Sequence, residues 1–462
     1  MKEFKNTRNP ILPFDIHVPD GEAHVMPDGK LYIYGSFDDR KDTYCSEKYH
    51  VVSTADMEHW TIHDVSFNGK DVPWFYDPNA PKYQGIDWNN LTPFMRKLQE
   101  QPQTVPVILE EETEEEEIKS LEEKKNEAPA FLYAPDAIYK DGKYYLYFCM
   151  SDNSEGVAVS DRAEGPFTNP IQLPCGGIDP AVFADTDGQV YYYWGQLYAR
   201  GVKLNPDMIS FDEQEIVHNL VTEEEHFFHE GASMRKIGDT YYLVYSDMER
   251  GKPTALGYAT AESPLGPFTY RGIIIDNAGC DPASWNNHGS IEQINGQWYI
   301  FYHRSSRCTR QYRRLCIEPI TLNPDGAINE VKMTSQGVGK PFGPGETIYG
   351  YQACQLSGTA FIDADKKGGE WITNISKEDA AVFRYVESET GFRSIVVEAE
   401  GSGFADIYLN DRLAGSVGID VEGANQGILS DSEKGPRELK LVFRETEKLR
   451  IISVTLYENK DM

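Results

Sequence analysis

The sequence has no long apolar run. None of its 462 residues falls in a window with the ~18 apolar residues that a membrane-spanning helix needs, and its N-terminal segment lacks the apolar core of a secretion signal. Cysteines are few and dispersed: the seven include no CxxC pair, which is typical of reduced thiols rather than of a disulfide framework. These absences predict a cytoplasmic protein without a membrane span.

Positive charge is also scarce. Lys and Arg total 44 against 74 Asp and Glu, which gives a formal net charge of −30. A surface of that sign repels phosphate backbones and anionic membrane surfaces. Nucleic acid and membranes are therefore not expected as partners.

Aromatic residues and glycine, by contrast, are plentiful. Aromatics make up 12% of the chain, with 28 Tyr and 39 Gly, a mixture that favours many short strands joined by tight turns. Five segments repeat one layout, a glycine turn followed by an aromatic strand. They are PDGKLYIYGSFDD at 27–39, KDGKYYLYFCMSD at 140–152, TDGQVYYYWGQ at 186–196, IGDTYYLVYSD at 237–247 and INGQWYIFYHR at 294–304. Asp-Gly and Asn-Gly before such a run predict hairpins, because the tight turn needs positive φ.

The spacing of these turns predicts the fold. The last four turn glycines are 46, 50 and 58 residues apart, which is in the range of a four-stranded propeller blade. We therefore predict an all-β protein whose residues 1–336 form a five-bladed β-propeller. The first interval, from Gly29 to Gly142, is too long for one blade, so an insertion is expected at about 66–130.

That insertion contains the acidic run EEETEEEEIKSLEEKKNE at 110–127. Such a run has almost no apolar face, and a solvated surface excursion is the ordinary interpretation. The alternative is that the nearby aromatic residues fold over the propeller and help to shape a substrate pocket. Those residues are Trp74, Phe75, Tyr76 and Trp88.

The pattern changes near the C-terminus. After a Gly/Pro-rich linker, GVGKPFGPGE at 337–346, several alternating segments follow without the blade motif. They predict a separate antiparallel β-sandwich over 347–462.

One polar residue stands shortly before each blade turn. These residues are Asp20, Asp136, Asp179, Glu230 and His288, six to nine positions before their turn glycines. Because the innermost strand of each blade lines the central channel, the five side chains are expected to converge on one depression. Crowded carboxyl groups move one another's pKa values apart, so that one keeps its proton and another stays ionised. Glycoside hydrolysis needs such a pair, an acid for the leaving oxygen and a base for water.

The same segments resemble a known family. The matching stretches are PDGEAH at 19–24, YAPDAIYKDGKYYLYF at 133–148, DPAVFADTDGQVYYYWG at 179–195, FFHEGASMRKIGDTYYLVYS at 227–246 and NNHGSIEQINGQWYIFYHR at 286–304. They resemble glycoside hydrolase family 43 over roughly residues 8–325. The resemblance implies a five-bladed propeller of inverting enzymes, exo- or endo-acting, on arabinose- and xylose-containing polymers.

The resemblance also implies roles for particular residues. Asp20 would be the general base, Glu230 the general acid, and Asp136 the carboxylate that orients the acid and tunes its pKa. His288 matches a histidine that approaches a central calcium ion through water, the arrangement that suits an oxygen-preferring ion. Arg313 and Arg314 resemble an arginine near the sugar site, and Asp179 and Trp74 are further candidates for substrate contact.

Each residue also has an ordinary structural interpretation. Asp20 is followed by Gly21, where relatives most often carry proline, and Pro-Asp-Gly is a common turn. Asp136 would equally well cap a turn, and Asp179 would serve as a structural carboxylate, since inversion needs only one acid and one base. His288 would be held by backbone carbonyls, and either arginine by a salt bridge.

The C-terminal sandwich weakly resembles a family 6 carbohydrate-binding module, through GGEWIT at 368–373 and FADIYLNDRLAGSV at 404–417. We favour a domain that braces the propeller, with glycan binding second. For the whole chain we predict an inverting exo-glycosidase that removes terminal β-D-xylosyl or α-L-arabinofuranosyl units from xylo- and arabinoxylo-oligosaccharides. The alternatives are an endo-arabinanase with an open cleft and a non-catalytic sugar-binding propeller; the sequence leaves the oligomeric state open.

Overall fold

The computed structural model describes residues 1–83, 129–420 and 422–458. Strands dominate these residues. The described helices are single turns: α3 (Glu223–His226), η1 (Gly69–Asp71), η2 (Glu213–Glu215) and η3 (Gly350–Gln352). Among the described helices none has the length and apolarity to cross a membrane.

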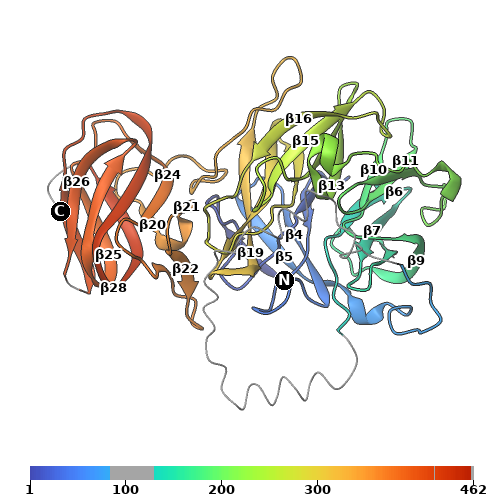
Figure 1. Cartoon of the computed structure of the whole chain (residues 1–462), viewed down its shortest axis with the longest axis horizontal. Helices are drawn as coiled ribbons and strands as arrows, with labels where there is room; N and C mark the ends of the chain where they lie inside the picture. The colour runs from blue at the N-terminus through green and yellow to red at the C-terminus, as the bar shows by residue number, and fades with distance from the viewer. Residues whose placement is uncertain (84–128, 421, 459–462) are drawn as a thin grey trace, which may run out of the picture.

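Five antiparallel sheets follow one another along residues 1–320 (Figure 1). Blade 1 is β1 (Lys2–Lys5), β2 (Glu22–Val25), β3 (Leu31–Tyr34), β4 (Lys48–Thr54) and β5 (His59–Asn68). Blade 2 is β6 (Asp136–Lys140), β7 (Lys143–Cys149), β8 (Ser154–Ser160) and β9 (Thr168–Gly176), and blade 3 is β10 (Ala181–Ala184), β11 (Val190–Trp194) and β12 (Arg200–Lys203). Blade 4 is β13 (Phe228–Ile237), β14 (Thr240–Asp247), β15 (Ala255–Ala261) and β16 (Thr269–Ile275), and blade 5 is β17 (Ser290–Ile294), β18 (Gln297–Ser306) and β19 (Thr309–Ile320).

The innermost strands close a ring. Each of β2, β6, β10, β13 and β17 contacts the two neighbouring innermost strands, and β17 contacts β2. A parallel bridge between Gly21 and Gly289 joins the first blade to the last. Gly289 has to be glycine there, because a Cβ would lie 1.8 Å from the carbonyl oxygen of Phe301. The predicted five-bladed β-propeller is confirmed.

The predicted turns form as expected. Lys140 pairs with Lys143 across Asp141 and Gly142, whose φ angles are 49° and 86°. Positive φ at both central residues is the two-residue hairpin turn that Asp-Gly favours, because its twist matches that of the strands. Asn295 and Gly296 make the same turn between β17 and β18, with φ angles of 53° and 82°.

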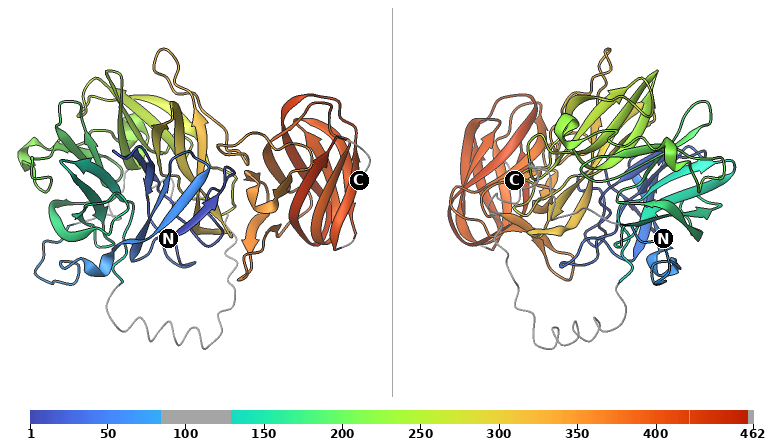
Figure 2. Two further views of the ribbon diagram at one scale, coloured as in Figure 1. Left: turned by 180° about the vertical axis from the view of Figure 1, so that it is seen from behind. Right: turned by 45° about the vertical axis from the view of Figure 1, so that its right-hand side comes forward.

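The C-terminal strands form the predicted β-sandwich, which lies beside the propeller (Figure 2). Its strands are β20 (Thr347–Tyr349), β21 (Gln355–Leu356), β22 (Phe361–Ala364), β23 (Glu370–Thr373), β24 (Ala380–Ser388), β25 (Ser394–Leu409), β26 (Arg412–Ile419), β27 (Gly423–Leu429) and β28 (Gly435–Tyr457). The long strands β25 and β28 pair along most of their length, with bulges that bend them.

Direct contacts hold the sandwich against blade 5 and against the segment that follows it. The backbone N–H of Arg307 donates to the carbonyl of Ile362 at 2.8 Å, and Ser335 donates to the carbonyl of Arg384 at 2.6 Å. Val382 of β24 belongs to the same buried apolar cluster as Ile300 and Tyr302 of β18. These contacts support the interpretation that this domain braces the propeller.

Candidate active site

Carboxyl groups and an imidazole meet where the innermost strands begin. Asp20 precedes β2, Asp179 precedes β10, Glu230 lies in β13, and His288 precedes β17. His288 Nδ1 is 3.7 Å from Asp20 Oδ1 and 3.8 Å from Asp179 Oδ2. The chain beside Glu230 packs on the same imidazole, since a Cβ on Gly231 would lie 2.7 Å from the ring. Four of the five predicted residues therefore converge.

Asp20 and Asp179 share an uncommon backbone conformation. Their φ angles are 57° and 56°, in the left-handed region that Asp tolerates better than most residues. Both side chains are buried, with 4% and 5% of their residue surface exposed. The same backbone conformation therefore places Asp20 ahead of β2 and Asp179 ahead of β10.

Asp20 is held as an ionised carboxylate. Arg313 Nη1 donates to both of its oxygens, at 2.8 and 3.0 Å, and Ser36 Oγ donates to Oδ2 at 2.7 Å. Burial alone would raise the pKa of Asp20, but Arg313, His288 and His303 outweigh it and lower the pKa to about 2. This carboxylate is free of protons at neutral pH and can accept one.

Arg313 is itself fixed by a second aspartate. Its Nε and Nη2 donate to the two oxygens of Asp38, each at 2.9 Å. Such a two-point pair leaves the guanidinium little freedom. Arg313 therefore lies at the site, as predicted, but its hydrogen bonds orient Asp20 instead of reaching into solvent.

Glu230 lies in a different electrostatic setting. Gln196 Nε2 donates to its Oε2 at 2.6 Å, and His229 Nε2 lies 3.8 Å from the same oxygen. Burial raises the pKa of Glu230, but His229, Lys252 and His288 outweigh that effect and leave the pKa below its ordinary value.

The pKa of Asp179 shifts in the opposite direction from that of Glu230. Burial raises the pKa of Asp179 well above its usual range, and the negative charges of Glu230 and Asp20 act in the same direction. When two such groups interact, the proton belongs to the pair. The two pKa values shift in opposite directions, so Asp179 holds a proton more readily than Glu230 does.

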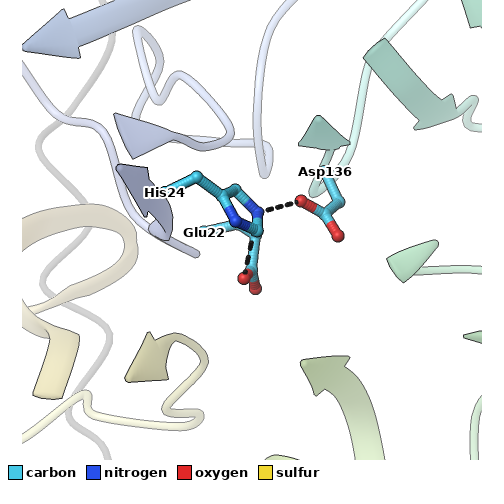
Figure 3. A group of neighbouring side chains, drawn as sticks. All are labelled: Glu22, His24 and Asp136. Carbon is cyan, nitrogen blue, oxygen red and sulfur yellow. Dashed lines mark hydrogen bonds and ion pairs between the residues drawn. The ribbon is translucent and has the colours of Figure 1, made fainter. Parts of the chain in front are cut away.

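Asp136 does not join this group. Its Oδ1 lies 2.6 Å from His24 Nε2, and its Oδ2 accepts from the backbone N–H of Val182 at 2.7 Å. Figure 3 shows the His24 ring between the carboxyl groups of Glu22 and Asp136. Burial raises the pKa of Asp136 to about 7. The predicted partner of the acid thus faces His24, while Asp179 takes the place beside Glu230.

The described donors in the channel leave few unoccupied protein oxygens for the predicted calcium ion. Glu22, His24 and Asp136 each offer one ligand atom within 4.8 Å of the others. However, Glu22 Oε1 already accepts from Arg235 Nη2 at 2.7 Å and from Ser233 Oγ at 2.9 Å. Calcium prefers six to eight oxygens, and a buried guanidinium supplies the positive charge here. Near His288 the described carboxyl groups are those of Asp20, Asp179 and Glu230, and Arg313 already donates to both oxygens of Asp20.

Chelation tests this conclusion. We expect EDTA followed by dialysis to leave both the melting temperature and the hydrolysis rate unchanged, because Arg235 already neutralises the channel carboxylates. Thermal unfolding with and without 1 mM calcium is the measurement. A calcium-dependent rise in the melting temperature would restore the metal that the sequence predicted.

Two predicted substrate contacts lie elsewhere. Trp74 is 7% exposed; it stacks on Phe148 and donates from Nε1 to Ser154 Oγ at 3.0 Å, so it fills the core between blades 1 and 2. Arg314 follows Arg313 on β19 and points to the opposite face, where it pairs with Glu370 of the sandwich at 2.5 Å. Trp88 and the acidic run at 110–127 lie outside the described residues.

Several residues that contact the site were not predicted from the sequence. Ser36, Asp38, Gln196 and His303 all contact the carboxyl groups or Arg313, and all stand at the end of the aromatic strand that follows a blade turn. The polar residues that end each repeat (GSFDD, WGQ, YHR) were the available signal. Lys252 and His229 had no comparable pattern around them.

Comparisons with known proteins agree with this geometry. The model of glycosyl hydrolases family 43 matches residues 109–328. A xylosidase/arabinosidase of Thermoclostridium stercorarium is 30% identical over 475 residues, covering 92% of this chain and 87% of the relative. The chain belongs to glycosyl hydrolase family 43. It is therefore a glycoside hydrolase. A xylosidase/arabinosidase of Humicola insolens is 31% identical, covering 68% of this chain and 96% of the relative.

Solved structures of this family share the fold. A GH43 beta-xylosidase/alpha-arabinofuranosidase from a compost microbial metagenome, in complex with xylotriose and calcium-free, is 29% identical with a TM-score of 0.53. The match covers 72% of this chain and 99% of the metagenome enzyme. A family 43 arabinoxylan arabinofuranohydrolase from Bacillus subtilis, at 22% identity and a TM-score of 0.50, covers 96% of this chain and 97% of that chain, so the similarity of fold extends into the sandwich.

Proposed function

We propose that this GH43 enzyme is an inverting exo-glycosidase that removes terminal β-D-xylosyl or α-L-arabinofuranosyl units from xylo- and arabinoxylo-oligosaccharides. One observation carries the proposal. Asp20, whose pKa is lowered to about 2, and Asp179, whose pKa is raised well above its usual range, both approach His288, on which the chain beside Glu230 also packs. A base and an acid on one channel are the two groups that inversion needs.

In the proposed reaction, Asp20 accepts a proton from a water molecule while the water oxygen attacks the anomeric carbon. The glycosidic bond breaks as Glu230 gives its proton to the leaving oxygen. Room for that water requires about 6.5–9.5 Å between the two carboxyl groups. Exchange with solvent then removes the proton from Asp20 and returns one to Glu230.

We assign the third carboxyl to Asp179 in place of Asp136. The negative charge of Glu230 raises the pKa of Asp179, which also approaches His288, whereas the oxygens of Asp136 are used by His24, Ala137 and Val182. While substrate is absent, Asp179 keeps the proton that Glu230 needs. Its negative charge after transfer would favour the protonated form of Glu230.

The substrate class rests on the relatives. Those from T. stercorarium and H. insolens are both described as xylosidase/arabinosidase, and the metagenome enzyme was solved with xylotriose. Terminal xylopyranosyl and arabinofuranosyl units present hydroxyls in similar positions, so activity on both is expected.

A hydrolysis panel tests the substrate and the mode of attack. We expect turnover of p-nitrophenyl β-D-xyloside or α-L-arabinofuranoside and release of single sugars from xylotriose. Linear arabinan should give no ladder of oligomers, because a ladder would identify the endo-arabinanase instead. Absence of turnover on every glycoside would favour the sugar-binding propeller.

We also propose that the enzyme works in the cytoplasm on short imported oligosaccharides. All seven cysteines are free thiols, six of them buried, as suits a reducing compartment. Cell fractionation with an antibody tests this, and recovery in the medium would contradict it.

A further inference from the structure

Two cations share one aromatic ring beside Glu230. Arg310 Cζ lies 3.8 Å from the ring centroid of Trp285, and Lys252 Nζ lies 5.1 Å from it. The three residues come from different elements: Arg310 from β19, Lys252 from the loop after β14, and Trp285 from the loop before β17. All three are partly exposed, so they remain within reach of a ligand.

Lys252 ties this group to the acid. Its Nζ donates to His229 Nε2 at 3.0 Å, and that nitrogen is 3.8 Å from Glu230 Oε2. Burial lowers the pKa of Lys252 to about 8, which Glu230 opposes and Arg310 reinforces. Lys252 is therefore mostly charged at neutral pH, and the two cations are close enough to act on each other.

A buried hydroxyl lies in the same region. Tyr44 Oη has no hydrogen-bond partner among the described residues, although a buried polar atom without a partner is costly. Its electrostatic neighbours include Arg313, Arg310 and Glu230. Burial raises the pKa of the Tyr44 phenol, so it stays protonated and can donate a hydrogen bond.

The positive charge of Lys252 and Arg310 is opposite in sign to the net charge of the protein. The chain carries −30 overall, yet two cations and an unused donor lie together beside the acid. Once Glu230 holds its proton for the reaction, the negative charge that acts most strongly on Lys252 is gone, while Arg310 still opposes the charge of Lys252. Salt screens the remaining acidic surface beyond about 8 Å, so an anion that reaches this position would be stabilised.

We propose that Lys252 and Arg310, with Tyr44, bind the carboxylate of a uronosyl substituent on the oligosaccharide. The planar guanidinium of Arg310 matches a carboxylate in shape. Because Glu230 protonates the leaving oxygen, the groups beside it face the leaving part of the substrate, where the uronosyl group would be attached. The proposal rests on the proposed function and specifies its substrate: acidic xylo-oligosaccharides.

The test compares xylotriose with xylotriose that carries a glucuronosyl group on the xylose next to the scissile bond. We expect kcat/KM to favour the acidic substrate by on the order of tenfold at low salt, and the preference to shrink as ionic strength rises. Arg310→Gln should lower the ratio of acidic to neutral kcat/KM by about the same factor. Arg271→Gln, an exposed arginine of blade 4, is the matched control and should keep the wild-type ratio.

Three other results would contradict different parts of the proposal. Equal kcat/KM on the two substrates, or an unchanged ratio in Arg310→Gln, would overturn the uronosyl site while leaving the glycosidase intact. Better turnover of a phosphate ester of xylotriose than of the uronosyl form would show that the anion is a phosphate and contradict the carboxylate. If the wild-type enzyme turns over neither xylotriose nor its glucuronosyl derivative, the proposed function itself is refuted.

Discussion

Glu230→Gln is expected to lower kcat on xylobiose by about 10³-fold, because general acid catalysis contributes roughly 10²–10⁴. The loss should be smaller on p-nitrophenyl xyloside, whose phenolate leaves readily without a proton. Activity of the wild type needs the proton, so it should fall as pH rises through the pKa of the Asp179 and Glu230 pair. Glutamine does not titrate, so the basic limb of the pH profile should disappear from this variant.

Glu224→Gln is the matched control. Glu224 is exposed on α3, a few residues before Glu230, and the same substitution there should change neither rate nor pH profile. Equal losses on substrates with good and poor leaving groups would show that Glu230 has another role. Full activity of Glu230→Gln would exclude it as the acid.

Asp179→Asn and Asp136→Asn should separate the two candidates for the third carboxyl. We expect Asp179→Asn to lower kcat by about 10²-fold or more, because Glu230 then loses the neighbouring carboxyl that we propose supplies its proton. Its basic limb should also move, since Glu230 then titrates alone. Asp136→Asn leaves His24 or Val182 without an acceptor, and we expect a cost of about 1–3 kcal/mol in the free energy of unfolding.

Steady-state pH profiles and denaturant unfolding of both variants are the measurements. The assignment fails if Asp136→Asn, at unchanged stability, loses more kcat than Asp179→Asn. In that case the role that the family resemblance gave to Asp136 would stand, and the channel contact with His24 would be part of the catalytic arrangement.

The fold was predictable because its signals are local and repeated. Each Asp-Gly or Asn-Gly turn fixes one hairpin, and the aromatic strand after it supplies the core between blades. Gly142 and Gly296 occupy the positive φ that the repeat requires. The regular spacing then leaves few architectures other than a propeller. The closure of the ring, where Gly21 pairs with Gly289, follows from the five-bladed architecture itself.

The choice between Asp136 and Asp179 was harder, although a signal existed. Asp136 stands six residues before its turn glycine, whereas Asp20 and Asp179 stand nine before theirs. At ~3.3 Å per residue in a strand, that difference places Asp136 roughly 10 Å deeper along the channel. It therefore meets His24, which lies on the same stretch of β2, instead of the acid.

Contacts between distant loops were beyond the sequence. Arg313 and Arg314 look equivalent as neighbours in the chain, but alternation along β19 sends one to Asp20 and the other to Glu370. Lys252 meets Trp285 and His229, the neighbour of Glu230, only because two loops and strand β13 fold together. Trp74 was predicted to contact sugar, yet it is buried, stacks on Phe148 and donates a hydrogen bond to Ser154.

The stereochemistry of the first-formed sugar tests the central claim, that Asp20 activates water while Glu230 protonates the leaving group. Proton NMR of a concentrated enzyme reaction with p-nitrophenyl β-D-xyloside follows the anomeric signals before mutarotation. The account predicts that α-D-xylose appears first and β-D-xylose only later. If β-D-xylose appears first, a carboxylate attacks the sugar directly, and the roles assigned to Asp20 and Glu230 are contradicted.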